Sequence, residues 1–394
     1  MRIAVISPFV DRQHGTERAV AELVEGLARR GRDQVHLYTQ RVADIELKGD
    51  EIGDGDGIVW HRVPSFPGPH LVGFLGWLFL NWWKRFRHHS GGNKEPEVIF
   101  SAGINAFDAD VILVHVVFHK LAELQSSKSA IRLRSWHRRI YYSLLCSLEA
   151  RIYRNPRTIL AAVSQHTADQ LSEYFGRRDV SVVPLGVDGQ RFSPSALLAM
   201  RKASRNARKY DADEIVLLLM GNDWHNKGLG TALGALRSCA DLPLRLIVVG
   251  QDARSPFRAE VAELGMSSRV EFCAPVRDVR EYYAAADILL APSFEDSFNL
   301  PVLEAMACGI PVIVSACAGI SAWLTHSQDA LLLQDPRSPG ELAAAIRVLA
   351  TDGALRQTMA RFAQLRAADF SWEKHVSGIQ ILLAEAASKK APKG

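Results

Sequence analysis

The sequence predicts an α/β protein built from two doubly wound parallel sheets, and two observations carry this prediction. Short β-branched runs alternate with longer helical patterns along most of the chain, which is typical of parallel strands joined by crossover helices. The chain has 394 residues, about twice what one hydrophobic core usually organises. We therefore expect two domains that repeat the same architecture.

The strands fall into two groups along the chain. In open parallel sheets, ligands bind beyond the carboxyl ends of the strands, so functional residues are expected in the loops that follow them. Two such sheets facing each other would form a cleft, which is a common place for a ligand site. The expected strands are, in chain order, Arg2–Ser7, Gln34–Thr39, Val98–Ser101, Val111–Val114, Thr158–Val163 and Val180–Val183, then Glu214–Met220, Leu244–Val249, Arg269–Phe272, Ile288–Ala291 and Pro311–Val314.

The two groups are separated by Leu185–Asp211, a segment with two glycines, a proline and the basic run Arg201–Lys209. Such a composition is typical of a link between domains. We expect a first domain at residues 1–190 and a second at 191–371. The last helix, Trp372–Lys389, is amphipathic, and we expect it to pack back on the first domain together with the end of the chain at residue 394.

Composition excludes several classes of protein. A formal net charge of +4, from 47 basic and 43 acidic residues, argues against bulk nucleic-acid binding. The five cysteines are scattered, which predicts neither a disulfide framework nor a zinc site and fits a reducing compartment. The first ten residues resemble a strand and not an export signal. The most apolar stretch, Leu71–Trp83, has 13 residues, too few to span a bilayer, so a cytoplasmic protein is expected.

The first strand is followed by a turn that contains Gly15 and Thr16 and leads into a helix from about Arg18. A glycine just before a helix allows backbone amides to approach an anion closely. Because a single glycine does not make a dinucleotide fingerprint, an ordinary strand-to-helix connection is the alternative interpretation.

A second loop, Gly221–Gly228, places Lys227 at the start of a helix. A lysine at the positive end of a helix dipole is unfavourable unless an anion offsets its charge. The loop therefore predicts a phosphate site, with a solvated lysine as the alternative.

The most informative stretch is Ala285–Ile313, where a buried strand leads through a polar loop into a helix expected to begin near Pro301. The backbone amides of Ser297, Phe298, Asn299 and Leu300 would then face a ligand at the helix N-terminus. Asp296 lies in the loop, and Glu304 follows eight residues later, on what we expect to be the first turn of the helix. Carboxylates are good partners for sugar hydroxyls, so one acid could hold a sugar and the other a ribose.

These segments, in this order, resemble the retaining glycosyltransferases of the GT-B fold, specifically the large family 4 that includes bacterial cell-envelope and lipopolysaccharide sugar transferases. The resemblance covers about Met1 to Trp372 and is carried by VSQHTADQLSEYF, VVPLGVDGQRF, GNDWHNKGL, VREYYAAADILLAPS and EDSFNLPVLEAMACGIPVI. It implies two Rossmann-like domains facing a cleft, with an acceptor-side first domain and a second domain that binds a nucleotide-sugar donor. It also implies sugar transfer to a sugar, glycan or lipid-linked acceptor with retention of configuration, without a metal or a cofactor.

The resemblance assigns roles in the second domain to several matching residues. It implies that Lys227 contacts the donor diphosphate, that Asp296 contacts the donor sugar and that Glu304 contacts the ribose. The amides from Ser297 to Leu300 would hold the pyrophosphate and the sugar, and the backbone at Val276 would read the nucleobase.

In the first domain, the resemblance places Gly15 and Thr16 beside the diphosphate. It places His115, directly after the strand Val111–Val114, at the donor sugar near the reacting carbon. His119 is the competing candidate for that role.

Three positions depart from the family pattern. The first acid of the pair is usually Glu, so that role stays open between Asp296, at the strict spacing, and Glu295 just before it. Asn222 stands where many members have a phosphate-binding arginine, and Gly15 with Thr16 replaces a glycine pair. Two alternatives stay open. One is a nucleotide-sugar epimerase or phosphorylase on the same fold, since these enzymes can use a related two-domain cleft. The other is a non-catalytic nucleotide-sugar binding protein, which Asn222 and Asp296 would fit.

The segment Leu71–His89 combines three tryptophans with basic residues. This pattern suits a helix that lies on anionic lipid, or a pocket for a lipid-linked acceptor, at the inner face of the plasma membrane. The alternative is a helix buried against the first sheet with a solvated basic tip. The residues concerned are Trp77, Trp82, Trp83, Lys84, Arg85 and Arg87.

Overall fold

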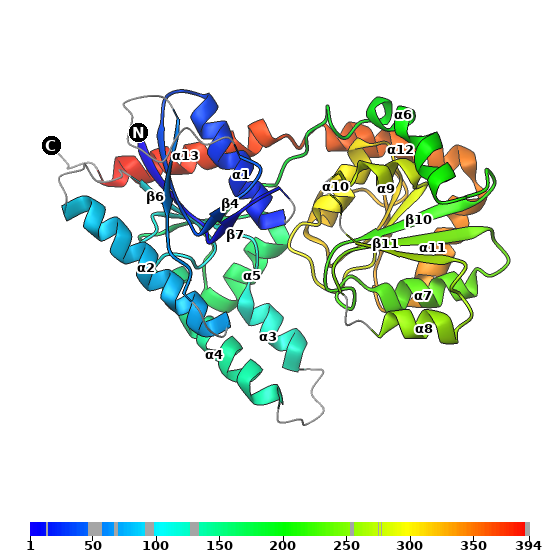
Figure 1. Ribbon diagram of the computed structural model, residues 1–394, viewed down its shortest axis with the longest axis horizontal. Coiled ribbons are helices and arrows are strands. Elements are labelled where there is room, and N and C mark those ends of the chain that lie inside the picture. The colour runs from blue at the N-terminus through cyan, green and yellow to red at the C-terminus, as the bar shows by residue number, and fades with distance from the viewer. Residues whose placement is uncertain are drawn as a thin grey trace. The chain divides into compact units, whose positions relative to one another are not determined.

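The computed structural model divides the chain into two compact units. One comprises Met1–Pro184 with Trp372–Gly394, and the other comprises Leu185–Ser371 (Figure 1). The structure describes residues 1–12, 15–45, 57–66, 70–90, 98–126, 134–252, 256–274, 276 and 278–390.

A seven-stranded parallel sheet forms the centre of the first unit, in the order β5-β3-β1-β6-β7-β8-β9. Its inner strands are continuous apolar runs because helices cover both faces of a parallel sheet; every residue of β7 and β8 is buried. The strands are β1 Arg2–Ile6, β3 Gln34–Thr39, β5 Ile58–Arg62, β6 Val98–Ala102, β7 Val111–Val114, β8 Ile159–Ala162 and β9 Ser181–Val182, with β2 Phe9–Val10 and β4 Arg41–Val42 as a separate short pair.

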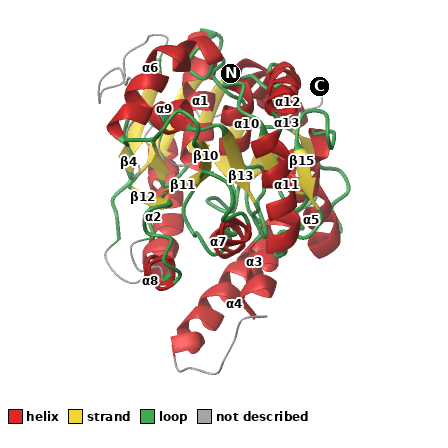
Figure 2. Ribbon diagram, turned by 90° about the vertical axis from the view of Figure 1, so that its right-hand side faces the viewer, coloured by secondary structure: helices red, strands yellow, loops and turns green. Residues whose placement is uncertain are grey.

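The C-terminal helix packs in the first unit, against α1 and against strands β6, β7 and β8. Gly26 of α1 makes the close approach possible, since a Cβ there would lie 2.6 Å from a methyl carbon of Val376. Arg30 ties the two helices together by donating to Ser377 Oγ at 2.7 Å. Elsewhere in this unit, α3 packs against α4 (Figure 2). The helices are α1 Gly15–Arg29, α2 His70–Ser90, α3 Phe118–Ser126, α4 Arg134–Tyr153, α5 Gln165–Phe175 and α13 Trp372–Lys390.

The second unit contains a six-stranded parallel sheet in the order β12-β11-β10-β13-β14-β15. Helices α7, α8 and α11 cover one face, and α6, α9, α10 and α12 cover the other (Figure 1). The strands are β10 Ile215–Met220, β11 Leu244–Val249, β12 Val270–Cys273, β13 Ile288–Ala291, β14 Val312–Ser315 and β15 Leu331–Leu333. The helices are α6 Pro194–Ala207, α7 Leu229–Ser238, α8 Phe257–Glu263, α9 Arg280–Ala285, α10 Leu300–Ala307, α11 Pro339–Thr351 and α12 Gly353–Ala367.

The fold class is as predicted, and each expected strand forms. The prediction that residues 185–211 form a link between the two domains is wrong. The segment Leu185–Asp211 belongs to the second unit and contains helix α6. Its basic run is structural, because Arg201 and Arg205 both pair with Asp287 at the start of β13, at 2.5 and 3.0 Å. Strands β5 and β15 and the short pair β2 and β4 were not predicted.

Helix α2 has a buried face and an exposed apolar face. Trp77 is buried in the core, and Arg85 is buried in a two-point ion pair with Asp108, both N–O distances being 2.8 Å. The sequence pattern suggested that these two residues belong to an interfacial surface. Their burial shows that they do not. The exposed face is a continuous helical stripe of apolar side chains: Val72, Leu75, Phe79, Trp82, Trp83 and Phe86. Among the described residues, no helix is both long enough and apolar enough to span a bilayer.

Candidate functional site

A narrow recess lies at the carboxyl ends of β10 and β13 in the second unit. Strand residues form its floor, and Lys227, Ser293, Asn299 and Pro301 line it. Helices α7 and α10 begin beside it. The predicted lysine and the predicted helix N-terminus are therefore brought together within one unit.

Two glycines shape the loop that carries the lysine. Gly221 has a φ of 136°, and a Cβ there would lie 2.6 Å from Lys227 Cε, so the lysine stem lies across this glycine. Gly228 has a φ of 73°, and a Cβ there would lie 2.1 Å from the carbonyl oxygen of Pro292. Neither position accepts a side chain without displacing the lysine or the loop after β13.

Lys227 is held by Asp296, with Nζ and Oδ2 2.6 Å apart and side chains that are 18% and 12% exposed. The other carboxylate oxygen of Asp296 accepts from the backbone amide of Phe298 at 3.3 Å. Asn226 joins the same two loops, since its side chain donates to the Glu295 carbonyl and its own carbonyl accepts from the Phe294 amide, both at 2.8 Å. The charge of Lys227 at the start of α7 is thus offset within the chain.

Helix α10 begins at Leu300, after Asn299 in the left-handed conformation with a φ of 77° and without a side-chain cap. In the part of the chain that the structure describes, the amides of Ser297, Asn299 and Leu300 have no hydrogen-bond acceptor. The predicted set of four amides therefore contains three that are available and one, at Phe298, that Asp296 engages. Such a helix terminus favours an anion.

Glu304 is the fifth residue of α10, one position further into the helix than expected, and is buried. Its carboxylate accepts from the hydroxyl of Tyr283, on α9, at 2.7 Å. Tyr283 is fully buried, and its ring packs edge-on against Phe192. This tyrosine was not predicted from the sequence, where its only signal is its place in the segment VREYYAAADILLAPS.

Asn222 and Val276 lie at the same edge of the second sheet, beyond β10 and β12. The side chain of Asn222 is exposed, and its oxygen accepts from the Gln251 amide at 2.8 Å, which joins the loops after β10 and β11. Val276 is exposed, while its neighbours Pro275 and Arg277 lie outside the described residues.

In the first unit, Gly15 and Thr16 begin α1, and His115 follows β7. Burial, together with nearby His375, lowers the pKa of His115 to about 3. Its Nε2 atom has no hydrogen-bond partner among the described residues. His115 is therefore neutral, with an unpaired ring nitrogen.

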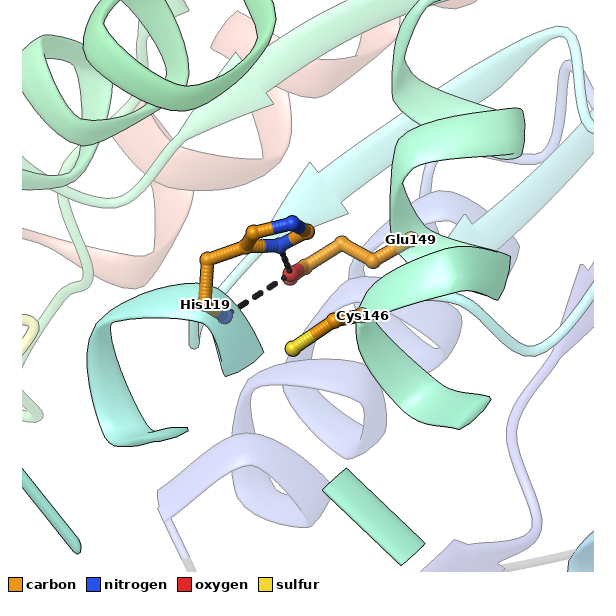
Figure 3. Close-up of side chains that lie close together, drawn as sticks. All are labelled: His119, Cys146 and Glu149. Carbon is orange, nitrogen blue, oxygen red and sulfur yellow. Dashed lines mark hydrogen bonds and ion pairs between the residues drawn. The ribbon is translucent and has the colours of Figure 1, made fainter. Parts of the chain in front are cut away.

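His119, the competing candidate, has a different role (Figure 3). The buried carboxylate of Glu149 accepts from the amides of Phe118 and His119 and from His119 Nδ1, at 2.8, 3.1 and 2.7 Å. Cys146 completes a group whose ligand atoms lie within 4.8 Å of one another. Because all three donors converge on Glu149, we interpret the group as the cap of α3, so His119 is committed to the fold.

Comparison with known proteins adds family matches over both units. Residues 13–191 match a model described as Glycosyltransferase Family 4, and residues 214–352 match one described as Glycosyl transferases group 1.

Curated relatives match over part of their length. The D-inositol 3-phosphate glycosyltransferase of Geodermatophilus obscurus is 33% identical over 248 residues, which are 59% of this chain and 53% of the relative. The lipopolysaccharide glucosyltransferase WaaG of Escherichia coli strain K12 is 30% identical over 187 residues, which are 46% of this chain and 50% of WaaG. The chain thus spans about half the length of the curated relatives it matches.

Solved structures share the fold over nearly the whole chain. WaaG, described as a glycosyltransferase involved in lipopolysaccharide biosynthesis, matches with a TM-score of 0.78 at 20% identity, covering 97% of this chain and 99% of WaaG. HepE of Anabaena, solved in complex with UDP and glucose, matches with a TM-score of 0.72 at 19% identity, covering 98% and 100%. At these identities the likeness concerns the GT-B fold.

Proposed function

This chain belongs to the family 4 glycosyltransferases of the GT-B fold, and from that premise we propose that it transfers a sugar from a nucleoside diphosphate sugar to an acceptor hydroxyl, with retention of anomeric configuration. The observation that carries the proposal is that Lys227 and Asn299, the residue just before α10, line one recess at the N-terminus of that helix. An ammonium group beside a helix N-terminus suits a diphosphate. Asp296, in the loop before α10, and Glu304, in α10 itself, each supply a carboxylate.

The chemistry requires stabilisation of a leaving group. As the bond between the anomeric carbon and the diphosphate breaks, negative charge grows on the phosphate oxygens. Lys227, once the diphosphate has taken the place of the Asp296 carboxylate, and the amides of Ser297, Asn299 and Leu300 would stabilise that charge in the transition state. The proposal needs no metal ion or cofactor, because these groups supply the positive charge.

Retention follows the family resemblance. The acceptor hydroxyl attacks from the side that the diphosphate leaves, and the departing phosphate takes the hydroxyl proton. Glu304 would hold the ribose, and the backbone at Val276 would contact the base. Asp296 would contact the donor sugar, with Glu295 as the alternative residue for that role. Gly15 and Thr16 beside the diphosphate, and His115 at the sugar, complete the set of predicted roles. The neutral state and unpaired nitrogen of His115 suit a hydrogen bond to a sugar hydroxyl.

We also propose that the acceptor belongs to glycan, lipopolysaccharide or glycolipid synthesis, and that the protein works in the cytoplasm at the inner face of the plasma membrane. The exposed stripe of α2 supports this part of the proposal, since apolar and aromatic side chains on one helix face suit the boundary between headgroups and acyl chains. Arg87 stacks on Trp83 at 4.6 Å and Lys84 lies on the same helix, which suits anionic lipid.

The experiment is a thermal-shift panel of nucleoside diphosphates and their sugars, followed by transfer assays with the donor that stabilises the protein. A ligand at 100 times its Kd stabilises the folded state by ~2.7 kcal/mol, a measurable shift. NMR of the anomeric proton of the product tests retention. Donor conversion without an acceptor would indicate an epimerase. Cleavage that needs free phosphate would indicate a phosphorylase, and binding without turnover would indicate a non-catalytic protein. If no common donor shifts the unfolding temperature, the proposal fails.

A further inference from the structure

We infer that Asp296 is an internal competitor for the anion site of the second unit, so that a bare diphosphate must displace its carboxylate before it can bind. The inference deepens the proposed function and rests on it for one point only, the identity of the natural ligand. The competition itself concerns three groups of this chain: the Asp296 carboxylate, the Lys227 ammonium and the Phe298 amide.

The carboxylate of Asp296 lies on two of the groups that would hold a phosphate. Its Oδ2 is 2.6 Å from Lys227 Nζ, and its Oδ1 is 3.3 Å from the Phe298 amide nitrogen. Carboxylate and phosphate oxygens accept charge-assisted hydrogen bonds from the same donors in the same geometry. The aspartate therefore stands where an anion would otherwise sit.

Both partners are held in place. The backbone carbonyl of Asp296 accepts from the Gly319 amide at 2.8 Å, and the Lys227 stem lies across Gly221. With side chains only 18% and 12% exposed, the pair is shielded from bulk water, so its attraction exceeds that of a surface pair. An incoming anion must therefore share Lys227 with a carboxylate whose backbone is fixed beside it.

This arrangement distinguishes two kinds of ligand. A bare diphosphate takes Lys227 from Asp296 and leaves the carboxylate beside a second negative charge. A diphosphate that carries a sugar brings hydroxyls, which can donate to the displaced carboxylate and satisfy it. Asp296 therefore weakens the binding of phosphate anions, including the released nucleoside diphosphate, more than it weakens the binding of a sugar-bearing donor.

The test is calorimetric titration with inorganic pyrophosphate, which has neither base nor sugar, at one fixed ionic strength. Asp296→Asn keeps the side-chain volume and removes the charge, and Asp296→Ala removes the group altogether. We expect both variants to bind pyrophosphate at least tenfold more tightly than the wild type. Adding Lys227→Met to Asp296→Asn should abolish this gain, because the gain depends on the released ammonium.

Asp241→Asn is the matched control, because it removes the same charge from an exposed ion pair with Arg347 in the same unit. It should leave pyrophosphate affinity within about twofold of the wild type. Unchanged or weaker pyrophosphate binding by both folded Asp296 variants, with binding still sensitive to Lys227→Met, overturns the competition and leaves the anion site intact. Failure of all variants to bind pyrophosphate overturns the anion site and the proposed function with it. An equal gain in Asp241→Asn assigns the effect to net charge and also overturns the inference.

Discussion

Tyr283 donates its phenolic proton to the Glu304 carboxylate across 2.7 Å, from helix α9 to helix α10. This contact orients a buried acid that the family resemblance assigns to the ribose. The tyrosine therefore serves as a positioning residue, since it acts through Glu304.

Tyr283→Phe removes this hydrogen bond and keeps the ring. A hydrogen bond to a charged group contributes ~1.5–3 kcal/mol, so we expect the KM for the donor to rise at least tenfold while kcat changes less. The matched control is Tyr282→Phe. Tyr282 lies on the same helix as Tyr283, and this variant loses a hydrogen bond to the carbonyl of Ala274, which follows β12. Equal effects of the two variants on KM would assign the loss to general loosening of α9.

Lys227→Ala removes the cation of the anion site. By the scale of single preorganised donors, we expect kcat/KM to fall by ~10²–10³. Arg347→Ala is the control, because this arginine is an exposed cation of the same unit, paired with Asp241. Steady-state kinetics with saturating acceptor provide the measurement, and activity within threefold of the wild type would contradict the role of Lys227.

Lys227 also illustrates what the sequence could and could not predict. Its unfavourable place at a helix start led to the prediction of a phosphate site, and that site stays a prediction. The group that offsets the charge in the structure is Asp296, 69 residues away, and only the packing of two loops reveals this pair. Likewise, Tyr282 and Tyr283 are equivalent in the sequence, and only the phase of α9 directs one of them to Glu304.

The strands show the same division between local and tertiary information. Continuous apolar runs such as β7 and β13 are evident in the sequence because both faces of a parallel strand are buried. Strand β15 has three residues, which is too short for a pattern, and β5 mixes apolar residues with His61 and Arg62. Helix α6 was missed because the glycines, the proline and the basic run of its segment were interpreted as a link between domains, whereas Asp287 pairs with two of the arginines.

The stability of the first unit should depend on pH through two buried histidines. Burial lowers the pKa of His115 to about 3, with a contribution from His375, and lowers that of His375 to about 4. Because these values lie below the ordinary value of about 6.5, the unfolded chain binds more protons than the folded chain between about pH 6.5 and pH 4. The free energy of unfolding therefore falls as the pH falls through this window, by up to ~1.4 kcal/mol per pH unit for each histidine.

Urea unfolding at a series of pH values measures this slope. His375→Gln should reduce it by the share of one histidine, and the double variant with His115→Asn should flatten it further. A slope that is the same in the wild type and in the double variant would show that other groups carry the acid sensitivity.

The exposed face of α2 should bind anionic membranes. Replacing Phe79 and Trp82 with serine removes two large side chains from the centre of the stripe and leaves the buried face of the helix unchanged. Full burial of one such side chain contributes ~1.5–3 kcal/mol, so even partial insertion of two predicts at least a tenfold loss of binding to vesicles rich in phosphatidylglycerol. Co-sedimentation measures the bound fraction, and a soluble short-chain acceptor should be used in parallel to show that transfer itself is retained.

The controls for this prediction are Leu198→Ser and Phe362→Ser, which remove exposed apolar side chains from the second unit. Both should bind vesicles like the wild type, since neither belongs to the stripe. Arg87→Gln should weaken binding to phosphatidylglycerol vesicles more than binding to neutral phosphatidylcholine vesicles, because its contribution is electrostatic. Equal binding of the wild type and the serine double variant to anionic vesicles would contradict membrane binding through α2. The acceptor would then have to be sought among soluble sugars and glycans.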